Sequence, residues 1–119
     1  MDALIEWLPR IGAILMLIIG LAGFFKPQSF TANMGIELTK PEAWAEMRTV
    51  MGGINIGYAL AALAFNSPMV YMAIGLAWSF GIVARLWSML KDDMTFKRSV
   101  PGFVVDGVLA FLFLSGLIL

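Results

Sequence analysis

The sequence contains no cysteine and no histidine, and only 13% of its 119 residues are charged. Without cysteine there is no disulfide, no thiol nucleophile and no thiolate-bound iron–sulfur cluster. Without histidine there is no imidazole-ligated haem, no usual zinc site and no Ser-His-Asp triad. The nine methionines are scattered along the chain, as is typical of packing residues. The sequence therefore predicts neither a cofactor nor a metal site.

Polar groups are too few to cover a surface that faces water. Hydrophobic residues make up 61% of the chain, whereas soluble domains have roughly 45–50% apolar and about 25% charged residues. The net charge is zero, and no run of Lys and Arg indicates binding to nucleic acid. We therefore expect the lipid bilayer to be the solvent, with other membrane-protein subunits or a second copy of the chain as further partners.

Four apolar stretches each approach the ~20 residues that a helix needs to cross about 30 Å of hydrocarbon. They predict an all-α integral membrane four-helix bundle with antiparallel up-down spans, built from residues 1–119 as one domain. The predicted spans are about 9–25, 43–65, 68–90 and 102–119.

Capping residues predict where these helices begin. Pro9 suits the first turn of the first helix. Thr39 and Glu42 have capping-box spacing before the second helix. Ser67 is able to cap the third helix and Pro68 to open it, so the second and third helices form an antiparallel hairpin.

The connection between the first two helices, residues 26–40, predicts a short helix of its own. Ser29 has the side chain of an N-cap, and Gly35 lies where such a helix would end. We expect this helix to lie on the lipid headgroups. The fourth long helix is expected to follow Pro101.

The short loops differ in positive charge, which predicts the orientation in the membrane. One side holds five basic residues and the other only Arg10; the five are Lys26, Lys40, Lys91, Lys97 and Arg98. Because basic loops stay in the cytoplasm, both termini are predicted outside a cytoplasmic membrane.

Three ionisable residues, Arg48, Arg85 and Asp106, fall within predicted spans, where each costs about 2.5–3.5 kcal/mol at the bilayer centre. Arg85 and Asp106 both lie roughly 8 Å below the cytoplasmic boundary. Side chains tilt toward the start of a helix, so Arg85 tilts toward the bilayer centre, where it needs a partner, and Asp106 tilts toward the cytoplasmic side. Their shared level predicts an Arg–carboxylate contact between neighbouring helices. The pair is either a structural clasp or a ligand or proton site, and Arg48 is either an anchor at the interface or part of that site.

Spacings of three and four define faces on the predicted helices. On the second helix one face holds Arg48, Gly52, Asn55, Ala59 and Ala62, and another holds Glu46, Val50, Gly53 and Gly57; on the third, one face holds Trp78, Gly81, Arg85 and Ser88. If these faces meet Asp106, they form a wet pocket floored by Asn55 and walled by Trp78, with Glu46 as a second acid. Asn55 is alternatively a bond between helices, and the glycines, with Gly75, are packing residues that let a helix of the bundle or of a second protomer approach.

The sequence resembles a family of small, uncharacterised bacterial four-helix membrane proteins known only as a domain of unknown function. The shared motifs are Phe25-x-Pro27, Glu46-x-Arg48, Gly52-Gly53 with Gly57, Arg85, and an acidic residue in the fourth helix, here Asp106. The resemblance covers nearly the whole chain. It implies a membrane fold in a bacterial inner membrane and no particular activity.

Three functions remain open from the sequence. The first is a non-enzymatic membrane component, an accessory or scaffold subunit or a bundle that binds lipid or a small ligand. The second is a small oligomeric proton-coupled carrier or ion channel that uses Asp106, Glu46 or the arginines. A membrane enzyme is the least favoured, because no nucleophile stands beside a base.

Overall fold

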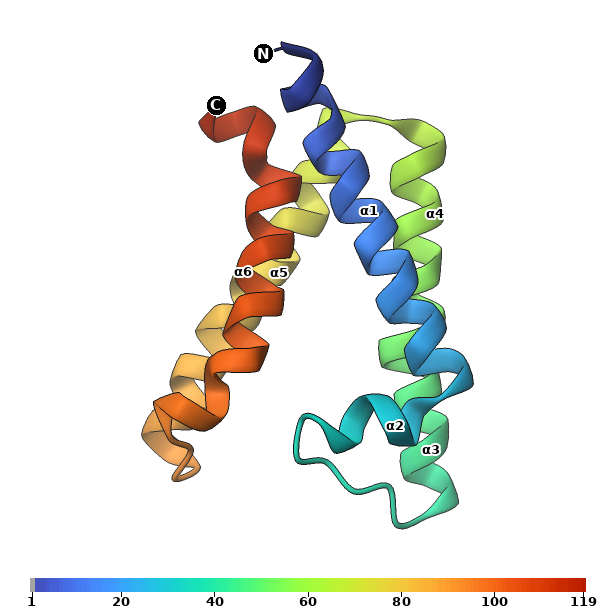
Figure 1. The fold of residues 1–119 in the computed structure, drawn as a ribbon, viewed down its shortest axis with the longest axis vertical. Helices are drawn as coiled ribbons and strands as arrows, with labels where there is room; N and C mark the ends of the chain where they lie inside the picture. The colour runs from blue at the N-terminus through green and yellow to red at the C-terminus, as the bar shows by residue number, and fades with distance from the viewer. Residues whose placement is uncertain (1) are drawn as a thin grey trace. The chain divides into compact units, whose positions relative to one another are not determined.

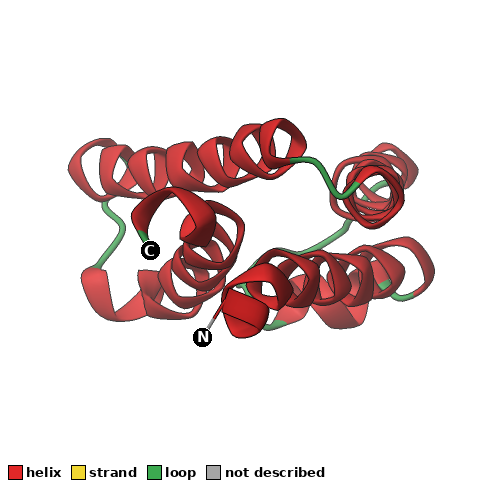
Figure 2. Ribbon diagram, turned by 90° about the horizontal axis from the view of Figure 1, so that it is seen from above, coloured by secondary structure: helices red, strands yellow, loops and turns green. Residues whose placement is uncertain are grey.

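A computed structural model of the chain describes residues 2–119, and all regular structure in that range is helical. The elements are α1 (Asp2–Phe25), α2 (Pro27–Ala32), α3 (Pro41–Met47), the π-helix η1 (Arg48–Ile54), α4 (Asn55–Phe65), α5 (Pro68–Lys91) and α6 (Phe96–Ile118) (Figure 1). Figure 2 shows these helices joined by loops, without a strand in the described range. The predicted all-α class is confirmed.

Three helices are long and apolar enough to cross a membrane. They are residues Ala3–Phe25 of α1, Pro68–Lys91 and Phe96–Ile118. At ~1.5 Å per residue each is about 35 Å long, which exceeds the ~30 Å of hydrocarbon in a bilayer. Large apolar side chains such as Ile18, Phe80 and Leu117 are exposed on them, as lipid-facing helices require.

Residues 41–65 form one helical run, but its middle is a π-helix that the sequence did not predict. Two side chains bond the backbone here: the Thr49 hydroxyl donates to the Ala45 carbonyl (2.8 Å), and Asn55 Nδ2 donates to the Met51 carbonyl (2.9 Å). Such bonds compete with the regular helical ladder. The glycine pair at 52 and 53 also weakens the preference for α-helix.

The start of α5 is as predicted, whereas α6 begins earlier than expected. Ser67 accepts a hydrogen bond from the Met69 amide, and Pro68 is the first helical residue. In α6 the cap is Thr95, whose hydroxyl accepts from the Arg98 amide (3.2 Å). Pro101 therefore lies inside α6, where it removes one amide donor without ending the helix.

Three other helix starts differ from the predictions, and each difference involves a proline. The expectation that Pro9 opens the first helix is wrong, because α1 begins at Asp2 and Pro9 lies in its interior. The predicted caps of α2 and α3 are absent: Lys26 and Lys40 precede these helices, with no capping side chain. A proline follows each lysine, and its fixed φ starts the helix in place of Ser29 or the Thr39–Glu42 box.

The chain packs as two units, residues 2–12 with Asn66–Leu119 (unit 1) and Ala13–Phe65 (unit 2). In unit 1, α5 and α6 form an antiparallel hairpin joined by residues 92–95 (Figure 1). The rings of Tyr71 and Phe113 lie 6.2 Å apart across it. The beginning of α1 packs on α6 at Gly12, where a Cβ would lie 3.1 Å from Leu112 Cβ.

Unit 2 is built on a close crossing between α1 and the η1–α4 run. Three glycines line it: a Cβ on Gly20, Gly23 or Gly52 would come within 3.0 Å of backbone atoms on the facing helix. The α2 segment packs beside α3 and η1, and Gly35 closes it in the left-handed conformation (φ 75°). Only glycine adopts this backbone without strain.

Candidate functional site

Arg85 of α5 and Asp106 of α6 form an ion pair inside the unit 1 hairpin. Arg85 Nε donates to Asp106 Oδ2 at 2.5 Å. The Asp106 side chain is only 4% exposed and that of Arg85 is 32% exposed. A carboxylate buried to this degree is costly unless a cation and hydrogen bonds accompany it. The guanidinium supplies both.

A glycine lies beside this pair on each helix, and only on α6 would a Cβ occupy space that the pair needs. Gly81 lies one turn before Arg85, and a Cβ there would be 3.4 Å from Asp106 Oδ2. Gly102 lies one turn before Asp106, and a Cβ there would overlap the guanidinium of Arg85. The sequence predicts Gly81 as part of this face, whereas Gly102 was not among the predicted residues. The sequence signal for Gly102 is its position four residues before an intramembrane acid. A small residue at that spacing leaves open space on the same face of the helix.

Trp78 lies on the face of α5 that carries Gly81 and Arg85, and its side chain is half-buried. Tryptophan, two glycines, an arginine and an aspartate thus belong to one region of the hairpin. Within residues 2–119 no group of three or more acidic, cysteine or histidine side chains is arranged to hold a metal ion.

Arg48 belongs to unit 2, where its guanidinium Nη1 donates to the Phe24 carbonyl at the end of α1. The last carbonyls of a helix have no partner within the helix, so a cation is stabilising there. The guanidinium also lies 5.7 Å from the ring centroid of Trp44, whose Nε1 donates to the Leu38 carbonyl (3.2 Å). Arg48 thus caps α1.

The other predicted site residues of unit 2 lie apart from this contact. Asn55 is buried and bonds the Met51 carbonyl of its own helical run, whereas Glu46 is exposed on α3. A pocket that combines Arg48, Asn55 and Glu46 with the residues of the hairpin stays a prediction.

The predicted packing glycines have different surroundings. Gly52 faces Phe24 closely, with a Cβ expected 2.7 Å from its Cα, and Gly75 lies directly beneath Leu114. A Cβ on Gly53 would have only the Arg48 carbonyl oxygen near it, at 3.8 Å, and a Cβ on Gly57 would have no atom within 4 Å. The first two glycines permit packing within a unit, while Gly53 and Gly57 present an open small-residue face.

Comparison with known proteins gives the family. The model of one protein family matches residues 5–117, nearly the whole chain. The chain belongs to the family Domain of unknown function (DUF4345). The matched range includes every predicted site residue of this DUF4345 chain, from Glu46 to Asp106. No curated protein and no solved structure matches it.

Proposed function

We propose that this DUF4345 protein is a non-enzymatic integral membrane protein, an accessory or scaffold component whose helices bind lipid and partner helices. The closed Arg85–Asp106 pair carries this proposal. The carboxylate is buried, its cation is in direct contact with it, and the guanidinium occupies the place that a Cβ on Gly102 would take. An acid held in this way acts as a clasp between helices.

The proposed topology is a bundle that crosses the membrane four times with antiparallel spans. Besides the three long apolar helices, the run of residues 41–65 is about 37 Å long at ~1.5 Å per residue, enough to cross the hydrocarbon. The basic loops would face the cytoplasm, with both termini outside the inner membrane of a bacterium. The α2 segment would lie at the cytoplasmic headgroups, with Pro27 and Thr31 on its buried side.

The open face around Gly53 and Gly57 supports association with another membrane helix. Helices associate in lipid mainly through close van der Waals contact, which small residues at a spacing of four allow. A Gly57→Leu change would obstruct that approach, and its Cβ would meet no atom within 4 Å.

One observation favours the carrier or channel as a second candidate. Arg85 is about one-third exposed although its partner is buried, so a solute has partial access to the guanidinium. A proton-coupled carrier would alternately release and recapture the Asp106 carboxylate. This alternative requires that the ion pair open during transport.

Gentle solubilisation followed by native mass spectrometry tests the scaffold proposal. We expect a co-purifying membrane protein or a second copy of the chain, lost in Gly57→Leu and kept in Gly107→Leu, a matched change at another open glycine. Saturable flux of a solute through liposomes that contain the purified protein alone would overturn the proposal. Loss of that flux in Asp106→Asn, in a protein that still folds, would establish the carrier.

A further inference from the structure

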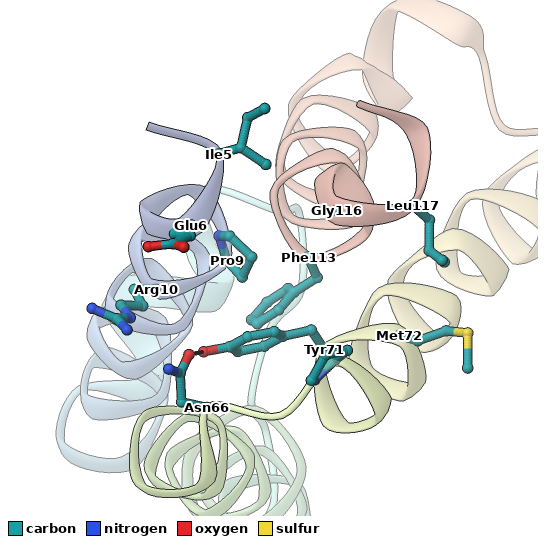
Figure 3. A pocket seen from close by; sticks show the side chains of 11 residues that line it. Ile5, Glu6, Pro9, Arg10, Asn66, Tyr71, Met72, Phe113, Gly116 and Leu117 are labelled. Carbon is teal, nitrogen blue, oxygen red and sulfur yellow. Dashed lines mark hydrogen bonds between the residues drawn. The ribbon is translucent and has the colours of Figure 1, made fainter. Parts of the chain in front are cut away.

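Unit 1 contains a pocket of about 410 Å³ far along the hairpin from the Arg85–Asp106 pair (Figure 3). Its walls come from the first turns of α1, the start of α5 and the last turns of α6. The volume is within the range of roughly 300–1,000 Å³ that is usual for small-ligand sites. None of the residues predicted as a site from the sequence lines it.

The inner part of the pocket is apolar and aromatic. Figure 3 shows the rings of Phe113 and Tyr71 side by side at its centre, with Pro9 of α1 facing them. Phe113 is 2% exposed and Tyr71 is 8% exposed, so the floor is fixed by core packing. Leu117 continues the apolar wall toward the end of α6.

The rim of the pocket is polar and carries both signs of charge. Glu6 and Arg10 stand four residues apart on α1, so they share one side of the helix. Both side chains belong to the described part of the chain, and they form no ion pair with each other. Arg10 instead lies 4.9 Å from the ring centroid of Trp7, and in Figure 3 both charged ends point away from the central rings. A carboxylate and a guanidinium are therefore both available at the rim.

Asn66 adds a hydrogen-bond donor to the same rim. The Tyr71 hydroxyl donates to Asn66 Oδ1, which fixes the orientation of the carboxamide and leaves its NH₂ group for another acceptor. The backbone of Asn66 is left-handed (φ 48°), a conformation that asparagine tolerates better than most residues. The turn before α5 thus holds a donor group next to the pocket.

We infer that this pocket binds a zwitterionic glycerophospholipid, of the phosphatidylethanolamine type, from the surrounding bilayer. The inference rests on the proposed insertion in the membrane. In that setting the pocket lies at the helix ends, at the depth of the headgroups of one leaflet. The ammonium group of the lipid meets Glu6, its phosphate meets Arg10 and the Asn66 amide, and an acyl chain covers Phe113 and Leu117.

Charge complementarity selects this class of lipid. An anionic lipid without an ammonium group would satisfy Arg10 and leave Glu6 facing a like charge, which is unfavourable in a partly desolvated site. A neutral apolar molecule would leave both charged groups without a partner at the rim. Only a headgroup with both signs of charge satisfies the two residues together.

A larger side chain at Gly116 would block the pocket. It lines the cavity, and no atom lies within 4 Å of the place where its Cβ would be. The Cβ of a leucine at this position would meet no atom, and the rest of its side chain would take up space of the ligand. Gly107, on the same helix, is equally open and does not line the pocket, so Gly107→Leu is the matched control.

The test is native mass spectrometry of protein released from nanodiscs of equal parts phosphatidylethanolamine and phosphatidylglycerol. We expect the wild type and Gly107→Leu to retain one phosphatidylethanolamine, with a preference of about tenfold over phosphatidylglycerol, equivalent to ~1.4 kcal/mol. Gly116→Leu should lose the bound lipid, and Glu6→Gln should lose the preference while still retaining a lipid.

Equal retention of both lipids by the wild type, or unchanged retention in Gly116→Leu, would overturn the pocket assignment and leave the membrane proposal intact. A wild-type protein that does not enter nanodiscs as an integral protein would overturn both. The two failures are therefore distinguishable in one experiment.

Discussion

The guanidinium of Arg85 occupies the space in which Gly102 would carry a Cβ. The ion pair of the hairpin thus depends on a residue that takes no part in it. Glycine at position 102 is needed for its lack of a side chain, because its helical backbone has an ordinary negative φ.

Gly102→Ala should displace the Arg85 guanidinium from Asp106 and weaken the hairpin. We expect a loss of about 1–3 kcal/mol, because the buried carboxylate loses part of its hydrogen bonding. Thermal unfolding in detergent, followed by circular dichroism, should show a midpoint lower by roughly 5–10 °C. Gly107→Ala, in open space on the same helix, should leave the midpoint unchanged or slightly raised. Equal effects of the two changes would contradict the role of Gly102.

Removal of the Arg85 charge and removal of the Asp106 charge should destabilise the protein to different degrees. Arg85→Gln strands a carboxylate that is 4% exposed and should cost about 3–4 kcal/mol. Asp106→Asn strands a guanidinium that is 32% exposed and so less completely buried, and about 2 kcal/mol is expected. In a double-mutant cycle of unfolding free energies, the double change should cost about 1–2 kcal/mol less than the sum of the two. Strict additivity would show that the two charges do not stabilise each other.

Adjacent glycines in η1 should respond very differently to the same substitution. Gly52→Ala places a Cβ 2.7 Å from Phe24 Cα, in contact with backbone that has no room to move. Overpacking of this kind costs typically about 1–3 kcal/mol. Gly53→Ala meets only one oxygen at 3.8 Å and should be neutral. Resistance to unfolding by sodium dodecyl sulfate distinguishes the two variants. If Gly53→Ala were destabilised and Gly52→Ala were as stable as the wild type, the packing described for unit 2 would be wrong.

Arg48→Gln should loosen the end of α1. The change removes a charge-assisted bond to the Phe24 carbonyl, and we expect a loss of about 1 kcal/mol, since the site is partly open to solvent. Hydrogen exchange of the amides near residue 26 should become faster. Glu46→Gln, which also removes one charge, at an exposed position of α3, should leave that exchange as in the wild type. If it also accelerated exchange, the effect would belong to α3 as a whole.

The positions of the apolar helices were predictable because length and hydropathy dominate in a lipid environment. The Ser67–Pro68 start of α5 was also predictable, because a capping hydroxyl followed by proline is a local signal. The start of α6 was not. Thr95 and Pro101 are both plausible beginnings, and the tolerance of a helix for an internal proline decides between them.

The part of the candidate site that helix geometry determines, the Arg85–Asp106 contact, was predictable from the sequence. Equal depth and opposite tilt of Arg85 and Asp106 follow from spacing alone, and the structure places the two groups in contact. The role of Arg48 at the end of α1 depends on a tertiary crossing between helices, which spacing within one helix does not reveal. The same is true of the pocket beside Phe113, whose walls come from three separate segments.

The π-helix sets the angular phase between α3 and α4. Hydrogen bonds in a π-helix span five residues, so η1 holds more residues per turn than the α-helices on either side. Glu46 is thereby rotated off the line through Gly53 and Gly57 that a uniform α-helix would give it. Deletion of one residue from η1 would swing α3 by about 100° and draw Arg48 away from Phe24. A deletion in η1 would therefore first disrupt the contact at the end of a different helix, α1.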